Sequence, residues 1–285
     1  MSTTLGSQLR VQEQITLANV SPSASSPPGV AIRVFVSGHC GAMGISTGTA
    51  TFEPLAELAY HEHDCSEAVT LLAGNASVLV DGRAYELCEL DCIHIPAGVP
   101  HSVRNQSVSS PLVAHWAFAT TEPSRRFVEA PPVREVRGLG KPEPGDPEHI
   151  SRFQEAEQYE LSPGALFRDL FKGSLGSVGI CGGYGRFQPG ASLPCHIHEY
   201  DESITIVEGT ALCLVQGNHY QVSGYDTAFV PVGKPHRFIN KTDTEMAMIW
   251  VYAGSEPERT LVEPEYCVGT LHWPGPAGFR KGGLS

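Results

Sequence analysis

Short apolar or alternating segments, separated by glycine, asparagine, aspartate and proline, recur along most of the chain. They follow one another at intervals of about ten residues, a spacing typical of an antiparallel sandwich or barrel. Such segments occupy residues 31–36, 67–74, 76–82, 92–98, 202–209, 211–217, 227–233 and 247–254. The turns at Asp81-Gly82 and Gln216-Gly217 are predicted to close β-hairpins, because glycine supplies the positive φ that tight turns need. The pattern therefore predicts an all-β protein.

An internal repeat organises this pattern. When each residue n is set beside residue n + 135, the two halves match without an insertion over a long stretch. Identical pairs include His61/His196, His63/His198, Glu67/Glu202, Thr70/Thr205, Gly74/Gly209, Gly82/Gly217, Asp91/Asp226, Gly98/Gly233, His101/His236 and Asn105/Asn240. The same offset sets Trp250 beside His115. Because a repeat of this kind marks one structural unit per copy, we expect two similar barrels.

The repeat divides the chain into four parts. We expect a first barrel with its lead-in segment, a proline-rich connector, a second barrel and a tail at residues 1–120, 121–164, 165–255 and 256–285. The only helical periodicity is weak and predicts a short connector helix over 150–161. Trp273 and Phe279 suggest that the tail packs across the barrels or against a partner subunit, so a homodimer is one expectation and a monomer the other.

Composition narrows the range of partners. The chain has 19 Lys and Arg against 31 Asp and Glu, a formal net charge of −12, and no basic stripe that would bind nucleic acid. A small-molecule ligand is therefore expected. The chain shows no long apolar run and no signal-like start, so we expect a cytoplasmic protein that does not bind a membrane. The eight cysteines include no CxxC, and most are expected to be small buried side chains rather than parts of a disulfide scaffold or zinc ribbon.

Each copy of the repeat contains four residues of the types that ligate metals. They are His61, His63, Glu67 and His101 in the first copy and His196, His198, Glu202 and His236 in the second. Residues two apart on a strand point to the same face, so both histidines of each HxH can face inward. Histidines inside apolar strands are more often core residues, but recurrence of the complete set favours ligands. Three imidazoles and one carboxylate suit a divalent metal with a position left for water or substrate.

Three other histidines lack a counterpart in the repeat. His94, His115 and His219 lie opposite phenylalanine, tryptophan and alanine at the offset of 135. They are therefore expected to be packing, surface or pocket-lining residues and not ligands.

The motifs around these ligands resemble those of the cupin superfamily. The segments HEHDCSEAVTLLAG and IHIPAGVPHSVRN, and then GASLPCHIHEYDESITIVEG and VPVGKPHRFIN, are similar to its patterns G-x5-HxH-x3-E-x6-G and G-x5-PxG-x2-H-x3-N. Two complete copies imply a bicupin, with two tandem jelly-roll barrels and one divalent metal in each. Iron(II) is favoured, with Mn, Ni, Co, Cu or Zn as alternatives. The chain departs from the leading glycines at Leu55, Leu90 and Tyr225, and it keeps Gly190.

The resemblance suggests several reactions. A dioxygenase acting on an aromatic, flavonol-like or β-dicarbonyl substrate is the leading hypothesis, with O2 as co-substrate. The resemblance to quercetinase-type bicupins also implies that the glutamate of the motif acts as a catalytic base. In this chain that residue is Glu67 or Glu202. The alternative is a Lewis-acid isomerase, lyase or aminohydrolase on a small carbonyl or carboxylate metabolite. Oxalate decarboxylation is less favoured, since such bicupins are longer and have a lid glutamate motif not identified here. The non-enzymatic alternative is a binding or storage protein.

Candidate substrate-binding residues follow from the same alignment. Arg168 and Arg186 could clamp a substrate carboxylate, or they could form surface or inter-unit salt bridges, as could Arg33. Phe187 and Trp250 are expected to bind substrate as part of an apolar lining. The other lining candidates are Phe52, Leu72, Ile95, Val113, Val207 and Phe229.

Overall fold

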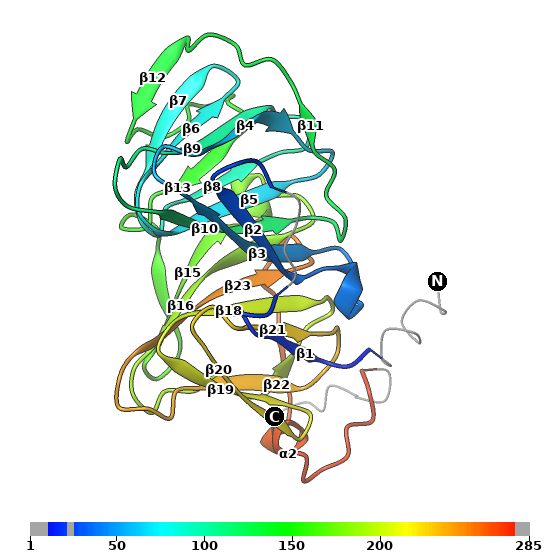
Figure 1. Ribbon diagram of the computed structural model, residues 1–285. Helices are drawn as coiled ribbons and strands as arrows, with labels where there is room; N and C mark the ends of the chain where they lie inside the picture. The colour runs from blue at the N-terminus through cyan, green and yellow to red at the C-terminus, as the bar shows by residue number, and fades with distance from the viewer. Residues whose placement is uncertain (1–10, 22–25, 277–285) are drawn as a thin grey trace.

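The computed structural model describes residues 11–21 and 26–276, which form two β-barrels packed against each other (Figure 1). Each barrel consists of an inner sheet, which faces the other barrel, and an outer sheet. α2 (Pro264–Val268) is the only α-helix in these two ranges. The predicted all-β class and the two tandem jelly-roll barrels are therefore confirmed. None of the helices in the described ranges has the length and apolar character needed to span a bilayer.

The first barrel is drawn in blue to green in Figure 1. Across its inner sheet the strands are β13 (His149–Ser151), β8 (Cys92–Ile95), β5 (Glu67–Ala73), β10 (Leu112–Phe118), β3 (Ser46–Phe52) and β2 (Val30–Val36). Across its outer sheet they are β11 (Arg126–Phe127), β4 (Glu57–Glu62), β9 (His101–Asn105), β6 (Ala76–Val80), β7 (Arg83–Leu87) and β12 (Glu135–Gly138). Three of these strands, β11, β12 and β13, come from the predicted connector.

The second barrel repeats the plan. Its inner sheet has the order β1 (Gln14–Thr16), β21 (Thr227–Val230), β18 (Glu202–Glu208), β23 (Met246–Tyr252), β16 (Cys181–Phe187), β15 (Ala165–Phe171) and β14 (Gln158–Ser162). Its outer sheet has the order β20 (Asn218–Ser223), β19 (Thr210–Val215), β22 (His236–Ile239), β17 (His196–Ile197) and β24 (Thr260–Leu261). Short 3-10 turns, η1 (Gly38–Cys40) and η2 (Gly173–Leu175), follow the equivalent strands β2 and β15.

The predicted hairpins form as the turn residues require. Asp81 and Gly82 have φ values of 41° and 81° and join β6 to β7, while Gln216 and Gly217 have 46° and 93° and join β19 to β20. Positive φ at both central positions gives a turn whose twist matches that of the flanking strands. The hairpin β6–β7 then fixes the register of the outer sheet, in which alternate residues of β6 are buried.

Leucine and tyrosine occupy three turns where the family pattern has glycine. Leu55, Leu90 and Tyr225 have φ values of 63°, 66° and 70°, and the retained Gly190 has 82°. The turns therefore keep their left-handed backbone although a Cβ atom makes that conformation costly. The departure from the family pattern therefore adds backbone strain to these three turns without changing their left-handed conformation.

The two inner sheets meet in a shared apolar layer. Phe35, Phe171 and Phe229 are fully buried there. Polar side chains cross the layer in pairs: Thr47 Oγ1 lies 2.7 Å from Ser203 Oγ. His115 is also buried at this junction, 3.4 Å from a threonine hydroxyl, so it is a packing residue. Four expected lining residues pack in this layer and do not line the cavity beside the first set of predicted ligands, namely Leu72, Val113, Val207 and Phe229.

The predicted helix over 150–161 is wrong. Ile150 is buried in β13, which pairs with β8, and the chain then turns before entering β14 in the other barrel. The Arg152 guanidinium contacts the Asp91 carboxylate at 2.7 Å, and the same carboxylate accepts the backbone N–H of Phe153. These tertiary contacts hold the segment in strand pairing and override its weak helical periodicity.

The lead-in segment joins the second barrel, not the first to which the sequence assigned it. β1 pairs with β21, with Gln14 opposite Phe229. Next to it, the Glu13 carboxylate lies 2.6 Å from Lys234 Nζ and accepts hydrogen bonds from Asn218 and Tyr220. The chain therefore crosses between the barrels before the first repeat begins.

Candidate metal centres

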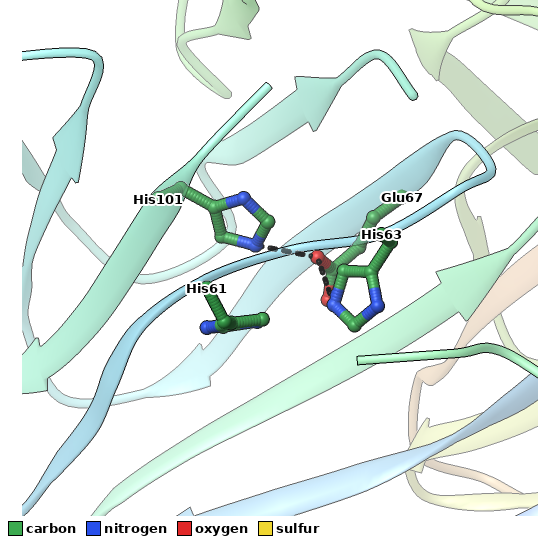
Figure 2. Close-up of side chains that lie close together, drawn as sticks. All are labelled: His61, His63, Glu67 and His101. Carbon is green, nitrogen blue, oxygen red and sulfur yellow. Dashed lines mark ion pairs between the residues drawn. The ribbon is translucent and has the colours of Figure 1, made fainter. Parts of the chain in front are cut away.

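The predicted ligands of the first barrel converge at one point, as Figure 2 shows. His61 lies next to the last residue of the outer strand β4, opposite His101, which starts β9, and His63 follows two residues later. Glu67 begins β5 in the inner sheet and reaches the same point from the other side. All four side chains are buried, and one ligand atom from each lies within 4.8 Å of the others.

The second barrel contains the same arrangement. His196 in β17 lies opposite His236 in β22, with His198 and Glu202 completing the set. The four side chains are buried, and their ligand atoms again lie within 4.8 Å of one another. The structure therefore brings together each of the two sets that the repeat predicted.

Backbone carbonyls orient every imidazole in these clusters. In the first, Nδ1 of His61 lies 2.7 Å from the Ala59 carbonyl and Nδ1 of His101 lies 3.0 Å from the Val99 carbonyl. His63 Nδ1 contacts the carbonyl of Ser124. A carbonyl only accepts, so each Nδ1 must hold the proton and each Nε2 presents a lone pair to the centre.

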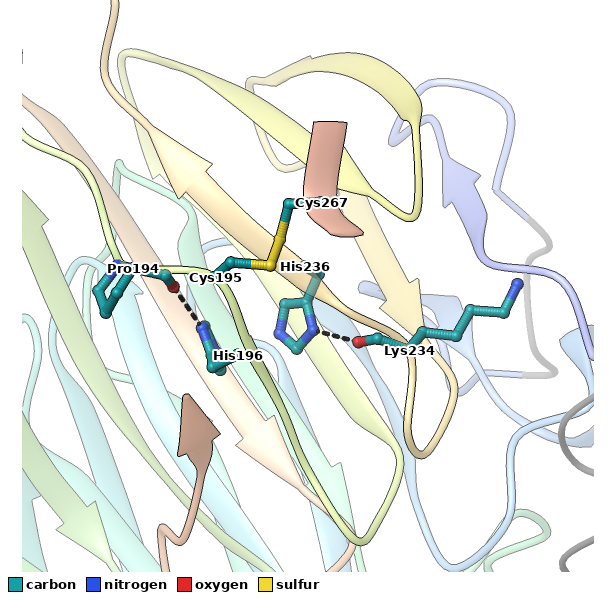
Figure 3. Close-up of a disulfide and its surroundings, with 6 residues drawn as sticks. All are labelled: Pro194, Cys195, His196, Lys234, His236 and Cys267. Carbon is teal, nitrogen blue, oxygen red and sulfur yellow. Dashed lines mark hydrogen bonds between the residues drawn. A yellow bond between two sulfur atoms is a disulfide. The ribbon is translucent and has the colours of Figure 1, made fainter. Parts of the chain in front are cut away.

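The histidines of the second cluster are oriented by the same kind of contact. Their Nδ1 atoms lie 2.7–2.8 Å from backbone carbonyls; the carbonyls belong to Pro194, Glu258 and Lys234. Two of these contacts, at His196 and His236, are drawn in Figure 3. Both clusters therefore have the tautomers of metal-ligating histidines.

Burial and mutual charge set the protonation states of the first cluster. Burial, and then the neighbouring His101, lower the pKa of His61 to about 3, and burial also lowers the pKa of His63. Burial by itself would raise the pKa of Glu67, but interactions with His63 and His101 bring it down to about 2. The carboxylate is therefore ionised at neutral pH, next to at least two neutral imidazoles.

These atoms fit a divalent metal. Nε2 of His61, His63 and His101 and Oε2 of Glu67 are buried without a well-formed hydrogen bond. Even so, Oε2 lies only 2.8 Å from His101 Nε2 and 3.5 Å from His63 Nε2. Lone pairs and a carboxylate that converge at such distances repel unless a cation lies between them. Imidazole and carboxylate together suit Fe, Mn, Co, Ni, Cu or Zn.

A cavity of about 330 Å³ opens beside the first centre. Glu67 and His63 form part of its wall. Most other lining residues are apolar, including Ile32, Val34, Ala50, Phe52, Leu58, Val69, Val103, Ala114, Trp116 and Phe118. A substrate held here would contact the metal ligands on one side and aromatic or aliphatic walls on the others.

Comparison with known families identifies the fold of each barrel. The family model of the cupin domain matches residues 48–118 and 183–252. The chain carries two cupin domains. Each match spans one complete set of predicted ligands, so the cupin motifs and the two buried clusters coincide.

One curated relative of this bicupin is an enzyme by its name. Quercetin 2,3-dioxygenase of Bacillus subtilis (strain 168) is 27% identical over 246 residues, which cover 72% of each chain. Together, the cupin domains, this relative and the two donor sets support a metal-dependent bicupin enzyme with two three-histidine, one-glutamate sites.

Solved structures of other bicupins share the fold. Oxalate decarboxylase of Bacillus subtilis at pH 4.6 superposes with a TM-score of 0.69 and 16% identity, over 87% of this chain and 78% of that one. The Lactobacillus farciminis oxalate decarboxylase formate complex gives 0.70 and 15%, over 87% and 88%. A further Bacillus subtilis structure, described for its Mn(II) centres, gives 0.71 and 16%, over 87% and 79%.

The second centre of the bicupin is packed against tyrosines. The ring of Tyr252 lies 4.3 Å from that of His198, and the ring of Tyr200 lies parallel to His198 at 5.8 Å. The Tyr200 hydroxyl contacts the carbonyl of Glu256 and accepts the backbone N–H of Glu258 at 2.7 Å. The segment over this centre is therefore held down by a side chain that the first barrel does not have, since Cys65 occupies the position of Tyr200.

A disulfide joins the tail to the second centre (Figure 3). Cys195 directly precedes the ligand His196 and is bonded to Cys267 of α2, with their Cα atoms 6.0 Å apart. Most cysteines are expected to be small buried side chains outside any disulfide; this pair is an exception, whereas Cys92, Cys181 and Cys213 are free and buried as expected. Disulfides are rare in the cytosol, so this bond does not support the expected cytoplasmic location. That location stays a prediction.

Removing this disulfide is expected to destabilise the protein. Cys195→Ala combined with Cys267→Ala opens a cross-link between residues 72 apart, which should lower the free energy of unfolding by about 2–4 kcal/mol. Chemical denaturation monitored by tryptophan fluorescence measures the change. The control is Cys88→Ala, an exposed free cysteine whose loss should leave stability unchanged. Equal midpoints for the double variant and the unmodified chain would show that the bond contributes nothing.

The tail packs as expected over its described part. Trp273 Nε1 donates to the carbonyl of Gly233 at 3.0 Å, and Trp273 is buried in a small cluster with Cys195 and Cys267. Phe279 lies outside the described residues. The homodimer stays a prediction.

The structure places the two predicted substrate-binding arginines away from the metal centres. Arg168 donates to the Ala156 carbonyl and lies over the Phe153 ring, and Arg186 pairs with Glu245 at the surface. Both line a separate hollow at the junction of the barrels. Phe187 and Trp250 are buried in the core of the second barrel. Ile95 and Phe52 are buried in the core of the first barrel, and of these two only Phe52 lines the cavity. Arg33 donates to the Ala18 carbonyl.

Sequence reasoning missed the aromatic wall of the first cavity because the offset changes by one residue. Trp116 pairs with Gly48 in the strand register, and Trp250 pairs with Gly183, so the two tryptophans are equivalent at an offset of 134. Phe118, whose ring lies 4.6 Å from that of His63, is the counterpart of Tyr252. The signal in the sequence is a one-residue deletion in the second copy, in the loop before β23, after which equivalent residues are 134 apart.

His94 and His219 bind no metal in either cluster. His94 is buried in β8, where burial lowers its pKa to about 4, and His219 is exposed in the hairpin strand β20. Both agree with the expectation that they are packing or surface residues.

Proposed function

We propose that the first barrel is the active site of a metal-dependent dioxygenase that cleaves an aromatic or enolic substrate. One observation carries this proposal: the cavity of about 330 Å³ has Glu67 and His63 on its wall together with Phe52, Trp116 and Phe118. Flat rings fit between such walls by stacking and edge contacts, whereas a small, fully polar substrate would make few apolar contacts with them. The proposed metal is iron(II), with manganese, nickel, cobalt or copper as alternatives.

The curated relative supports the same substrate class. Quercetin 2,3-dioxygenase, which is 27% identical, acts on a flavonol by its name. A flavonol combines fused aromatic rings with an acidic enolic hydroxyl, and both features match a cavity with aromatic walls and one buried carboxylate.

The residues of the first barrel have separable tasks in this reaction. His61, His63 and His101 would hold the metal, and a redox-active metal would supply the electronic coupling between substrate and O2. Glu67 is ionised and lies at the cavity wall, so its carboxylate can accept the proton from an acidic O–H or C–H of the bound substrate. Phe118 and Trp116 orient the ring and keep water away from the reacting atoms.

The test is metal analysis followed by oxygen uptake. Protein purified without added metals is analysed for atoms of each metal per chain, and then assayed with an oxygen electrode against quercetin and acetylacetone. We expect about two atoms of a redox-active metal per chain and metal-dependent oxygen consumption with at least one compound. Zinc as the sole metal, with no uptake after reconstitution with iron, manganese, nickel, cobalt or copper, would overturn the proposal and favour the Lewis-acid alternative.

A further inference from the structure

A repeated segment passes over both metal centres. Residues 121–129, TEPSRRFVE, match 255–263, SEPERTLVE, at the offset of 134. We call residues 121–126 and 255–260 the straps. The carbonyl of Ser124 accepts the Nδ1 proton of His63, and the carbonyl of Glu258 accepts that of His198, so the straps occupy equivalent places. In the first barrel the residue after this carbonyl is Arg125, which lines the cavity with His63 and Glu67; its counterpart in the second strap is Arg259.

Among the residues that the structure describes, Arg125 is the only lysine or arginine that lines the first cavity. The side chain is partly buried, and its Nε is buried without a hydrogen-bond partner. No ion pair to a carboxylate within 4.0 Å involves it among the described residues, whereas the next residue, Arg126, pairs with Glu62 at the surface. Burial lowers the pKa of Arg125, while the nearby Glu67 raises it in part, so the cation is incompletely compensated.

Two further donors in the same cavity lack partners. Trp116 Nε1 and Ser46 Oγ are buried without a hydrogen bond, and both residues line the cavity with Arg125. Buried donors are nearly always satisfied in folded proteins, so three unsatisfied ones in a single cavity point to a ligand that offers acceptor oxygens. The remainder of the wall is apolar and includes Phe52, Trp116 and Phe118, so we expect these oxygens to be carried on an aromatic frame.

Charge balance selects an anion. A divalent metal, the Glu67 carboxylate and Arg125 sum to two positive charges beside an apolar wall, because the histidines are neutral ligands. An excess of buried positive charge is costly without a counter-charge. We propose that Arg125 binds an anionic oxygen of the ligand, a carboxylate, phenolate or enolate attached to an aromatic ring. This inference rests on the proposed function for the site, and it adds the ligand's charge and the residue that selects it.

The test compares two ligands that differ in charge and hardly in shape. 2-Naphthoate and the neutral 2-naphthamide are titrated into metal-loaded protein, and their dissociation constants are measured by calorimetry. We expect the naphthoate to bind more tightly, and Arg125→Met to weaken it by about tenfold to a hundredfold, the effect of removing a charged hydrogen bond. The naphthamide should bind the variant almost unchanged.

The matched control is Arg126→Met. It lies in the same strap and removes the same charge, but its partner is the surface carboxylate of Glu62, so the preference for naphthoate should persist. Arg125→Lys should restore part of the preference. If Arg125→Met retains the preference while its metal content is unchanged, Arg125 does not bind the anion and the proposal is wrong.

The outcome is separable from that of the proposed function. Charge-selective binding that depends on Arg125, in a protein that never consumes oxygen, would leave the inference intact and remove the dioxygenase. Oxygen uptake that is insensitive to Arg125→Met, with no preference for the naphthoate, would do the reverse.

Discussion

Replacing His63 by alanine is expected to reduce turnover about a thousandfold, whereas His198→Ala should leave most of the activity. A bound metal contributes several kcal/mol to transition-state stabilisation, and each 1.36 kcal/mol corresponds to a factor of ten. His63 lines the cavity of the first barrel. His198 lies instead against Tyr252 and Tyr200, under a strap held by the Tyr200 hydroxyl. Steady-state oxygen uptake measures the difference.

The two variants control each other because they remove the same ligand from equivalent positions. Each should reduce the metal content from two atoms per chain to about one, which elemental analysis measures alongside the assay. The metal lost from the second barrel should affect stability more than activity. Equal activity in the two variants would contradict the assignment of catalysis to the first barrel, and the reverse ranking would move it to the second.

The ligand sets could be predicted from the sequence because they depend on local geometry repeated twice. His61 lies in β4 and His63 one residue beyond its end, and the turn before His101 is fixed by Pro96 and Gly98, so short-range rules determine which way these side chains point. Duplication then separated ligands from ordinary core histidines such as His94, which has no histidine at the equivalent position.

The substrate-facing residues could not be predicted in the same way because they depend on long-range packing. Arg168 lies on a strand whose outer face meets the connector, and its guanidinium binds the Ala156 carbonyl. Arg125, in contrast, lies in a segment without a clear strand or helix pattern, whose repeat appears only at the offset of 134, and it reaches the cavity only because the Ser124 carbonyl meets His63. Similarly, Cys195 and Cys267 are 72 residues apart, and only the packing of α2 against β19 and β22 brings them together.

The connector illustrates how tertiary pairing overrides a local preference. Residues 150–161 have weak helical periodicity, yet Ile150 is more favourably buried against the first barrel through β13. The following turn is anchored by Asp91, which binds both Arg152 and the backbone of Phe153. An isolated helix of that length is marginal in water, so a few buried contacts decide the outcome.

Replacing Glu67 by glutamine is expected to reduce the maximal rate by about a hundredfold to ten-thousandfold, the range for loss of a general base. The amide is nearly isosteric, so the three histidines should still bind metal, although more weakly. It cannot accept a proton, whereas the Glu67 carboxylate is ionised at neutral pH, since its interactions with His63 and His101 outweigh burial and bring its pKa to about 2. Rates are measured by oxygen uptake at saturating metal and substrate.

The matched variant is Glu202→Gln, which makes the same change at the second centre. We expect it to lower metal affinity without a comparable loss of rate, because the tyrosine-packed centre contributes little to turnover. The role of Glu67 as a base is distinguished from its role as a ligand by metal content: a fall in rate at full occupancy indicates proton transfer. If Glu67→Gln loses activity only in proportion to lost metal and regains it when metal is restored, Glu67 is a ligand alone and another group must accept the proton.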